Sequence, residues 1–502
     1  MNIKQAKQEI QNTLRAYLSK DELGNYLIPT LRQRPILLMG PPGIGKTQIM
    51  AQIAAETGVG LVAYTITHHT RQSAIGLPFI EHRTYEGREY AITEYTMSEI
   101  LASVYELMKK TGMKEGILFL DEINCVSETL APMMLQFLQC KTFGNQALPE
   151  GWLIVAAGNP PEYNKSVRDF DVVTLDRVKR IDVEEDFAVW KEYARRKGIH
   201  GAVVSYLDIK KENFYCIETT VDGLQFATAR GWEDLSELII AYEKLGLRVD
   251  REVVGQYIQL PRIAKDFANY LELYYKYQRI YHVEDILQGT WQAITSAELK
   301  AAPFDEKLSV MGLVLSRLSE EAKRLRLQDE LTVTLHSTLK EFKASLEGCA
   351  PHQSLDRLIA VRQEAMKVAK DAGHLDKESR DLMMRELNAL RSYRARLVDE
   401  DIAEHDAFEA VKEWFNTEVE LRRELAIQTS SMFDNAFRFL EETFAQGQEL
   451  VMFVTEVTAG YDTSWFVENF GCDAYYRHNR ELFFDATQKR IIDSIAAARA
   501  EK

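Results

Sequence analysis

Residues 40–47 form the first segment of the chain whose residue types could do chemistry. The segment fits the pattern G-x-x-x-x-G-K-[ST], follows an apolar run and precedes a stretch with helical periodicity. Glycines let successive backbone N–H groups point at phosphate oxygens, and the start of the next helix adds a positive dipole. Lys46 offers a mobile charge to the β- and γ-phosphates, and the Thr47 hydroxyl can bind magnesium. The predicted nucleotide-binding loop consists of Gly40, Pro41, Pro42, Gly43, Ile44, Gly45, Lys46 and Thr47.

Two carboxylates follow a second apolar run. Residues 116–120 read Gly-Ile-Leu-Phe-Leu, and Asp121 and Glu122 come directly after them. Ligands of open α/β sheets bind at the carboxyl ends of the strands, so we expect both acids to lie beside the phosphate-binding loop. Asp121 would hold magnesium, directly or through water. Glu122 would orient and deprotonate the attacking water if the chain hydrolyses its nucleotide.

An amide follows a third apolar run, at residues 152–157. Gly158 and Asn159 come next, and Pro160 ends the strand. An amide at the end of a strand can hydrogen-bond both the γ-phosphate and the attacking water. Asn before Pro is also ordinary turn chemistry, so Asn159 gains its meaning from following the other two motifs in order.

These motifs require strands and helices that alternate along the chain. Short β-rich runs and helical stretches do alternate before residue 162, where nine of the twelve prolines lie. This spacing predicts βαβ units, and therefore an α/β fold with a mostly parallel sheet and helices on its faces. The expected strands are 35–39, 60–66, 116–120 and 151–157, and the expected helices lie around 47–56, 97–110 and 129–139.

The C-terminal part of the chain has a different pattern. It contains no proline after Pro351, and its periodicity is that of long helices. Gly373 separates the stretches 354–371 and 376–398, which favours a helical hairpin. A stripe with steps of 4, 3, 4 and 3 residues predicts packing against a partner helix, and it consists of Met383, Leu387, Leu390, Arg394 and Leu397.

Composition excludes several classes of protein. The chain is 46% hydrophobic and 27% charged, which is ordinary for a folded globular protein. Its length of 502 residues argues for two or three domains. The net charge of −15 argues against nucleic acid as a partner. Five dispersed cysteines fit a reducing cytoplasm. We expect no membrane insertion, because the N-terminal helix is amphipathic and no apolar run reaches about 20 residues.

The motifs together resemble the MoxR-type branch of the AAA+ ATPases. The resemblance rests on the loop at 40–47, the run 118–124, the Gly158–Pro160 segment and Leu175-Asp176-Arg177, and it covers roughly residues 25–300. It implies an AAA+ P-loop core, a small helical lid, and ATP with Mg²⁺ bound between subunits of a ring, usually of six. Lys46 and Thr47 then form the Walker A pair, Asp121 and Glu122 the Walker B pair, and Asn159 is similar to sensor 1.

The same resemblance assigns two arginines. Arg177 is similar to the finger that reaches the γ-phosphate of a neighbouring subunit, and Arg180 is the competing candidate. In the lid, Arg230 lies in a segment similar to sensor 2, although Ala229 stands where the family commonly has proline. Arg262, which follows a proline, is the rival for that role.

Several further segments receive predictions. Residues 70–96 and the segment Phe143–Pro149 look like the two insertions of this branch. His68 and His69 are expected to be polar residues at a strand end rather than metal ligands. Residues 462–464 read Asp-Thr-Ser, like the start of the metal-adhesion loop of von Willebrand factor A-type domains, but Phe466 replaces the second serine. The chain should therefore not carry that domain, and the aromatic residues around 475–484 should be core.

The expected domains are an α/β nucleotide-binding domain with an N-terminal helix (1–183), a helical lid (184–300) and an all-helical C-terminal domain (301–502) that docks a partner. The resemblance implies an oligomeric, chaperone-like ATPase in the cytoplasm that remodels a partner with a von Willebrand factor A-type domain. A nucleic-acid motor of restriction type and a nucleotide-gated scaffold with little turnover are the alternatives.

Overall fold

The computed structural model describes residues 1–68, 76–143, 146–163, 167, 170–220, 223–346 and 349–480. The chain forms two compact units. Unit 1 comprises residues 1–189 and 360–383, and unit 2 comprises residues 190–359 and 384–502. Residues 360–383 therefore belong to unit 1, although the residues on either side of them belong to unit 2.

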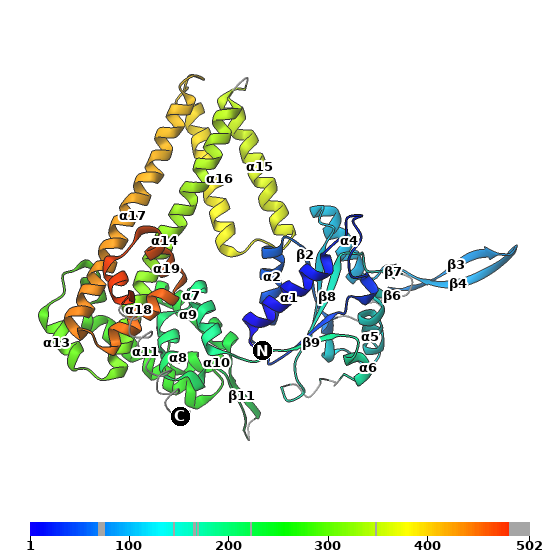
Figure 1. The fold of residues 1–502 in the computed structure, drawn as a ribbon, viewed down its shortest axis with the longest axis horizontal. Coiled ribbons are helices and arrows are strands. Elements are labelled where there is room, and N and C mark those ends of the chain that lie inside the picture. Colours follow the sequence, from blue (N-terminus) through cyan, green and yellow to red (C-terminus); the bar gives the residue numbers. More distant parts are fainter. Residues whose placement is uncertain are drawn as a thin grey trace, which may run out of the picture. The chain divides into compact units, whose positions relative to one another are not determined.

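The centre of unit 1 is a five-stranded sheet in which all paired strands are parallel (Figure 1). The strand order is β2-β5-β8-β1-β9. The strands are β1 (Ile36–Met39), β2 (Gly60–Thr65), β5 (Gly116–Asp121), β8 (Trp152–Gly158) and β9 (Lys179–Asp182).

Helices cover both faces of this sheet, because the side chains of each strand alternate between two apolar cores. In β1, Ile36 and Leu38 join the core formed with α1 and α2, whereas Leu37 and Met39 join the core formed with α4 and α5. The fold predicted from sequence, a parallel α/β sheet with flanking helices, is confirmed. The helices and 3₁₀ turns of unit 1 are α1 (Ile3–Leu18), η1 (Thr30–Arg32), α2 (Lys46–Thr57), η2 (Ile66–His68), α4 (Glu99–Thr111), η3 (Ile123–Cys125), α5 (Ala131–Cys140) and α6 (Val172–Leu175).

Two glycines make room for a tryptophan at the start of the sheet. Gly60 pairs with Gly116, and Gly116 pairs with Trp152, which is fully buried. A Cβ at Gly116 would lie 2.6 Å from the indole ring. The three strands can therefore begin side by side only because two of them lack a side chain at this level.

Two small hairpins lie in the segments expected to be insertions. The strands β3 (Pro78–Tyr85) and β4 (Arg88–Tyr95) form an antiparallel hairpin, whose turn places Glu86 and Gly87 at φ 50° and 79°. The strands β6 (Thr142–Phe143) and β7 (Gln146–Ala147) form the second. The residues expected at the start of the first insertion, 70–73, and at the turn of the second, 144–145, lie outside the described residues.

The described residues of unit 2 are helical apart from one antiparallel pair of strands. Its helices α7–α13 fall mostly in the segment expected to be a lid. Its elements up to residue 301 are α7 (Phe187–Lys197), α8 (Gly201–Ile209), η4 (Lys211–Asn213), β10 (Cys216–Thr220), β11 (Gly223–Ala227), α9 (Ala229–Leu245), α10 (Arg251–Tyr257), α11 (Pro261–Tyr281), α12 (Val283–Gln288) and α13 (Ala293–Ala301).

The described part of the C-terminal extension is entirely helical, as predicted (Figure 1). Of the predicted stripe on α16, Leu387, Leu390 and Leu397 are buried. The helices are α14 (Phe304–Ser345), α15 (Pro351–Asp371), α16 (Lys377–Asp399), α17 (Ala407–Phe444), α18 (Gln448–Ala459) and α19 (Tyr461–Phe470). In the described part of the chain, no helix is both long and apolar enough to cross a bilayer.

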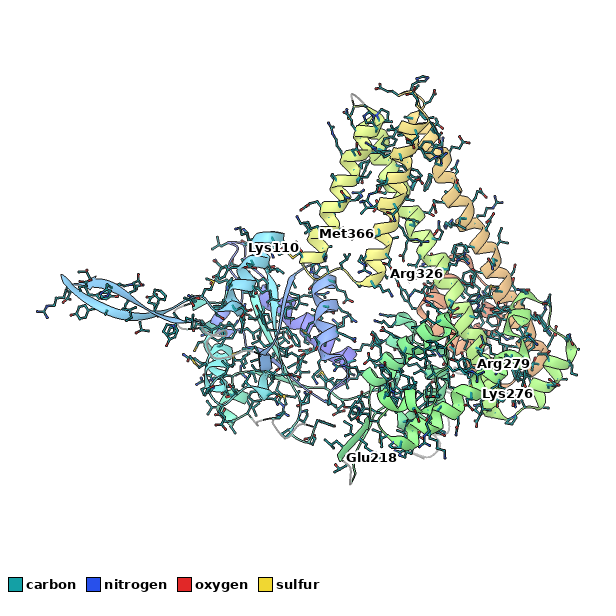
Figure 2. The ribbon with its side chains drawn as sticks, turned by 180° about the vertical axis from the view of Figure 1, so that it is seen from behind. Lys110, Glu218, Lys276, Arg279, Arg326 and Met366 are labelled. Atoms are coloured by element: carbon teal, nitrogen blue, oxygen red, sulfur yellow. The ribbon has the colours of Figure 1, made fainter. Side chains whose placement is uncertain are left out.

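Side chains pack together across the expected boundary at residue 300. The hydroxyl of Tyr270 on α11 donates to Ser205 on α8 at 2.9 Å and lies 3.1 Å from Ser309 on α14. Helix α14 also carries Arg326, which is buried and paired with Asp462 at 2.7 Å (Figure 2). The helices on both sides of residue 300 therefore share one compact unit.

Candidate functional site

The predicted phosphate-binding loop connects β1 to α2. Gly43 and Gly45 adopt φ values of 77° and 91°, a left-handed conformation that glycine adopts without strain. Gly45 caps α2, which begins at Lys46. A Cβ at Gly40 would lie 2.6 Å from the carbonyl oxygen of Val183, so the start of the loop also requires glycine. The loop therefore curls at the N-terminus of a helix, where an anion is stabilised.

Lys46 is largely buried and donates three hydrogen bonds to uncharged oxygens. Its Nζ lies 2.7 Å from the carbonyl oxygens of Gly40 and Pro41 and 2.8 Å from Oδ1 of Asn159. These contacts hold the ammonium group over the loop. None of the three oxygens carries a formal charge, so these contacts leave its attraction for an anionic ligand intact.

Thr47 and Asp121 meet beside the loop. The Thr47 hydroxyl donates to Oδ2 of Asp121 at 2.7 Å. A hydroxyl and a carboxylate oxygen are hard ligands of the kind that Mg²⁺ takes alongside phosphate oxygens and water. This pair therefore fits a magnesium ion bound with a nucleotide.

Glu122 has an unusual backbone and a side-chain partner. Its φ of 56° is left-handed, which costs a residue with a Cβ of order 1 kcal/mol. Its N–H donates to Asp121 Oδ1 at 2.9 Å, and its carboxylate accepts from the Thr67 hydroxyl at 3.0 Å. The two carboxylates thus have different hydroxyl partners, Thr47 for Asp121 and Thr67 for Glu122. The sequence does not predict this role of Thr67, because the residue lies 55 positions from Glu122.

The strand order brings these residues together. The loop, the acid pair and Asn159 follow β1, β5 and β8, and β8 lies between the other two strands. Gly40 N–H donates to the carbonyl oxygen of Gly158, which joins the ends of β1 and β8. Parallel strands place all three ends at one edge of the sheet, as the sequence predicts.

The two candidate trans arginines lie in different settings. Arg177 follows α6, and its guanidinium contacts the side-chain oxygen of Gln139 on α5. Arg180 lies within β9 and is paired with Asp182 at 2.8 Å. Both are exposed. On α6, which ends just before Arg177, Val172 is 81% exposed.

The two candidate lid arginines belong to unit 2. Arg230 is exposed in the first turn of α9, whose cap is formed by the Thr228 side chain accepting from Gly231 N. Arg262 begins α11 and is paired with Glu218 at 2.7 Å. Arg262 is thus already paired with a carboxylate of its own unit.

The remaining predicted segments have structural partners or lie outside the described residues. Asp462 pairs with Arg326, and Thr463 donates to the carbonyl oxygen of Val457 at 2.7 Å, so this segment starts a helix. Tyr475 is buried, as expected of a core residue, whereas Tyr476 is exposed, so the prediction of a core cluster is wrong for that residue. His69 and residues 481–484 lie outside the described residues.

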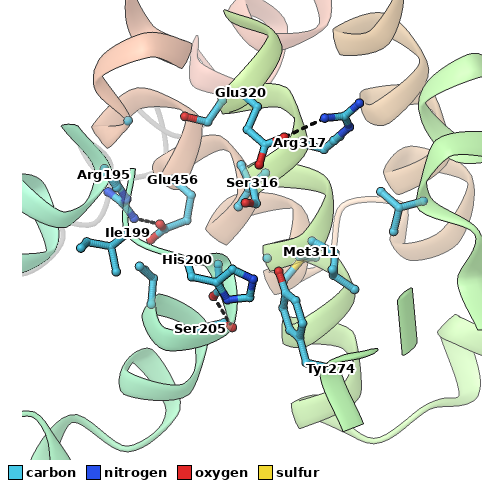
Figure 3. A pocket seen from close by; sticks show the side chains of 18 of the residues that line it. Arg195, Ile199, His200, Ser205, Tyr274, Met311, Ser316, Arg317, Glu320 and Glu456 are labelled. Atoms are coloured by element: carbon cyan, nitrogen blue, oxygen red, sulfur yellow. Dashed lines mark hydrogen bonds and ion pairs between the residues drawn. The ribbon is translucent and has the colours of Figure 1, made fainter. Parts of the chain in front are cut away.

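A cavity of about 1310 Å³ lies within unit 2, lined by side chains of α7, α8, α11, α14 and α18 among others (Figure 3). Lys191 donates to Asp208 at 2.6 Å and to Glu456 at 2.9 Å. Arg195 contacts Glu456 as well. Burial lowers the pKa of Lys191 to about 8. At this end of the cavity the cations are therefore paired with carboxylates.

Comparisons with known proteins agree with this geometry at the level of the domain. Residues 36–174 match the family "ATPase family associated with various cellular activities (AAA)". This part of the chain contains the strands and loops that bring Lys46, Asp121 and Asn159 together. The chain thus carries an AAA-type nucleotide-binding domain. No curated protein sequence matches it as a relative.

Solved structures provide more distant similarities. A candidate ATPase from Cytophaga hutchinsonii is 16% identical with a TM-score of 0.23, and the match covers 36% of this chain and 46% of that one. Two single-residue variants of Thermotoga maritima RuvB are 14% and 16% identical, each with a TM-score of 0.29. These matches cover 51% and 52% of this chain and 70% of each RuvB chain. The chain thus spans about half the length of the first of these structures.

Proposed function

We propose that this chain is a MoxR-like AAA+ ATPase that binds ATP with Mg²⁺ and hydrolyses it. The observation that carries this proposal is the meeting of three strand ends. Lys46 contacts Asn159, Thr47 contacts Asp121, and Glu122 lies next to Asp121 with its own hydroxyl partner, Thr67. A protein that only bound nucleotide would not need Glu122 in this position.

Each group has a role in this proposal. The loop N–H groups and Lys46 bind the phosphates, and Thr47 and Asp121 hold magnesium, which draws charge from the phosphate oxygens when bound. Asn159 binds the γ-phosphate and orients the attacking water. Glu122 takes the proton of that water, which its carboxylate can do while it accepts from Thr67, because an ionised carboxylate has two accepting oxygens. Arg230 serves as the lid arginine, because the contact of Arg262 with Glu218 occupies the rival.

Ring assembly belongs to the same proposal. An exposed Arg177 that follows a short helix carrying the exposed Val172 suits a surface that a neighbouring subunit covers, whereas Arg180 is paired with Asp182. We infer a homo-oligomer, by resemblance a hexamer in the cytoplasm, in which Arg177 reaches the γ-phosphate of the next subunit. The partner inferred from the resemblance is a protein with a von Willebrand factor A-type domain that residues 301–502 dock and the ring remodels.

The two alternatives make different demands on the chain. A scaffold that hardly hydrolyses ATP would not need the base, so the retained Glu122 argues against it. A nucleic-acid motor would need cationic surface, and the net charge of −15 opposes it. Stimulation of ATP hydrolysis by DNA would favour the motor.

The decisive experiment replaces the proposed base. Glu122→Gln removes the proton acceptor and keeps the shape of the side chain, so ATP binding should persist while turnover falls by about 10²–10⁴-fold. Steady-state hydrolysis and equilibrium binding of a fluorescent ATP analogue measure the two effects. Glu150→Gln, at an exposed glutamate of the same unit, is the matched control. Near wild-type turnover of Glu122→Gln would refute the assignment.

The partner is tested with the same variant. A tagged Glu122→Gln chain should remain bound to ATP and retain its partner on affinity resin, and a chain lacking residues 301–502 should lose that partner. Mass spectrometry of the retained proteins should find one with a von Willebrand factor A-type domain. Loss of nucleotide affinity on deletion would show instead that residues 301–502 support the ATPase core.

A further inference from the structure

Asn124 connects two of the strand ends that carry the candidate catalytic groups. It lies in η3, two residues after Glu122, and only 3% of it is exposed. Its Nδ2 donates to the main-chain carbonyl oxygen of Asn159 at 2.8 Å. A single side chain thus fixes the end of β8 to the turn that follows β5.

The contact between these segments is close enough to require a glycine. A Cβ at Gly158 would lie 2.6 Å from Oδ1 of Asn124 and 2.9 Å from its Cγ. Gly158 therefore lets the amide lie flat against the main chain of β8. Any larger residue at 158 would push Asn124 away from Asn159.

The two polar atoms of the Asn124 side chain differ in their hydrogen bonding. Nδ2 has a partner, whereas the buried Oδ1 has none among the described residues. The amide cannot turn over, because Oδ1 would then face the carbonyl oxygen of Asn159. Burying an unpaired acceptor costs free energy, so the side chain is better explained by what it positions than by a gain in stability.

The bond extends to the phosphate-binding loop. Asn159 receives Asn124 at its main-chain carbonyl, and its own side-chain Oδ1 accepts from Lys46 at 2.8 Å. We propose that Asn124 is a positioning residue that holds the main chain of Asn159 so that its amide faces Lys46 and the γ-phosphate. This proposal rests on the proposed ATPase function, in which Asn159 acts directly and Asn124 acts only through it.

A double-mutant cycle tests the proposal in the full-length protein. Asn124→Ala should lower kcat about tenfold, as expected when one hydrogen bond no longer supports the transition state. Its dissociation constant for ATP should stay within about twofold of wild type, because the loop and Lys46 remain. In an Asn159→Ala background, Asn124→Ala should have no further effect on kcat. The same factor in both backgrounds would overturn the proposal, because Asn124 would then act independently of Asn159.

Two further variants guard against a general folding defect. Gly158→Ala should reproduce the loss of kcat by displacing the Asn124 amide, and adding it to Asn124→Ala should lower kcat no further. Asn435→Ala is the matched control, because the Asn435 amide also donates to a main-chain carbonyl, that of Leu287, at 2.8 Å in unit 2. This control should keep wild-type kcat. An equal loss of kcat in Asn435→Ala would identify a general defect and overturn the proposal.

A crystal structure of Asn124→Ala gives a readout that needs no turnover. The contact between Lys46 and Asn159 should be lost or lengthened in the variant. If that contact stays at its original distance, Asn124 does not position Asn159 and the proposal fails. If wild type itself does not hydrolyse ATP, the proposed function fails instead, and the crystal structure still decides whether Asn124 positions Asn159.

Discussion

A buried cation of unit 1, Lys46, and a buried cation of unit 2, Arg326, make different sets of contacts. In unit 1, Lys46 donates to two main-chain carbonyls and to the amide oxygen of Asn159, all of which are uncharged. In unit 2, Arg326 is 4% exposed and pairs with the carboxylates of Asp462 and Glu330, each at 2.7 Å. These three hydrogen bonds of Lys46 go to neutral dipoles, whereas these two ion pairs bring opposite charge to Arg326.

The two sets of contacts, those of Lys46 and those of Arg326, suit different roles. A cation held by neutral oxygens keeps its attraction for an anion, because its partners supply orientation without cancelling its charge. A cation paired with carboxylates offers a ligand little, since the ligand would have to displace those carboxylates. The neutral contacts of Lys46 thus orient its ammonium group over the phosphate-binding loop, and the ion pairs of Arg326 join α14 to the segment of Asp462 in unit 2.

The largest expected effect extends the comparison to exposed arginines. Arg177 contacts the side chain of Gln139 and interacts electrostatically with Asp171, whereas Arg180 is paired directly with Asp182. Arg177→Ala should bind ATP almost normally but hydrolyse it about 10³–10⁵-fold more slowly, the range measured for an arginine supplied in trans. Steady-state ATP hydrolysis measures the loss, and Arg180→Ala is the control that should keep most of the activity.

Mixing subunits shows whether this arginine acts across an interface. Arg177→Ala mixed with Lys46→Ala should regain activity where rings exchange subunits, because an intact Lys46 site then meets an intact Arg177. No activity in verified mixed rings would exclude a shared site. If Arg180→Ala shows the loss and the rescue instead, the site is still shared between subunits. The kind of contact that an arginine makes in its own subunit would then not identify the functional one.

The next largest effect concerns the ion pair of unit 2. Asp462→Asn removes one carboxylate from Arg326, and leaving a buried charge undercompensated costs about 3–5 kcal/mol. We expect the lower end, because Glu330 remains. Urea titrations of the full chain measure the free energy of unfolding, and Arg326→Met with Asp462→Leu should recover most of the loss. A loss below about 1 kcal/mol in Asp462→Asn would show that the pair is not structural.

The groups that the sequence predicts are those encoded in short contiguous segments. The loop at 40–47 and the acids after β5 follow from strand and loop chemistry within a few residues of each other. Asn159 is predictable in the same way, because it comes directly after β8. The parallel sheet is also predictable, because its buried strands are nearly continuous apolar runs. Four of the five strands therefore agree with prediction to within a residue or two.

The features that the sequence does not predict depend on contacts between distant residues. Thr67 meets Glu122 across 55 positions, and Arg326 meets Asp462 across 136 positions. No local pattern marks either pair. The fifth strand, β9, reads Lys-Arg-Ile-Asp, and only Ile181 is buried, so it lacks the apolar run that identifies the others. Tertiary packing, rather than local propensity, determines these features.

The smallest expected effect tests the comparison with two lysines of similar pKa. Burial lowers the pKa of Lys141 in unit 1 and of Lys191 in unit 2 from 10.5 to about 8. Lys191 has Asp208 and Glu456 as partners. The Nζ of Lys141 is buried and has no hydrogen-bond partner among the described residues. The two lysines therefore share a direction of pKa shift but differ in what their removal leaves behind.

Lys141→Met should therefore stabilise the protein, whereas Lys191→Met should destabilise it by removing the cation that pairs with Asp208 and leaving Glu456 with Arg195 as its cation. A pKa lowered from 10.5 to about 8 corresponds to a cost of about 3 kcal/mol in the folded state at pH 7. That cost is full below pH 8 and disappears as the pH rises toward 10.5, because in that interval the unfolded chain binds more protons than the folded one. The gain in unfolding free energy of Lys141→Met, measured by urea titration, should therefore shrink between pH 8 and pH 10. A gain that does not change with pH would show that the gain comes from packing, and a loss of stability would show that Lys141 has a partner that its burial conceals.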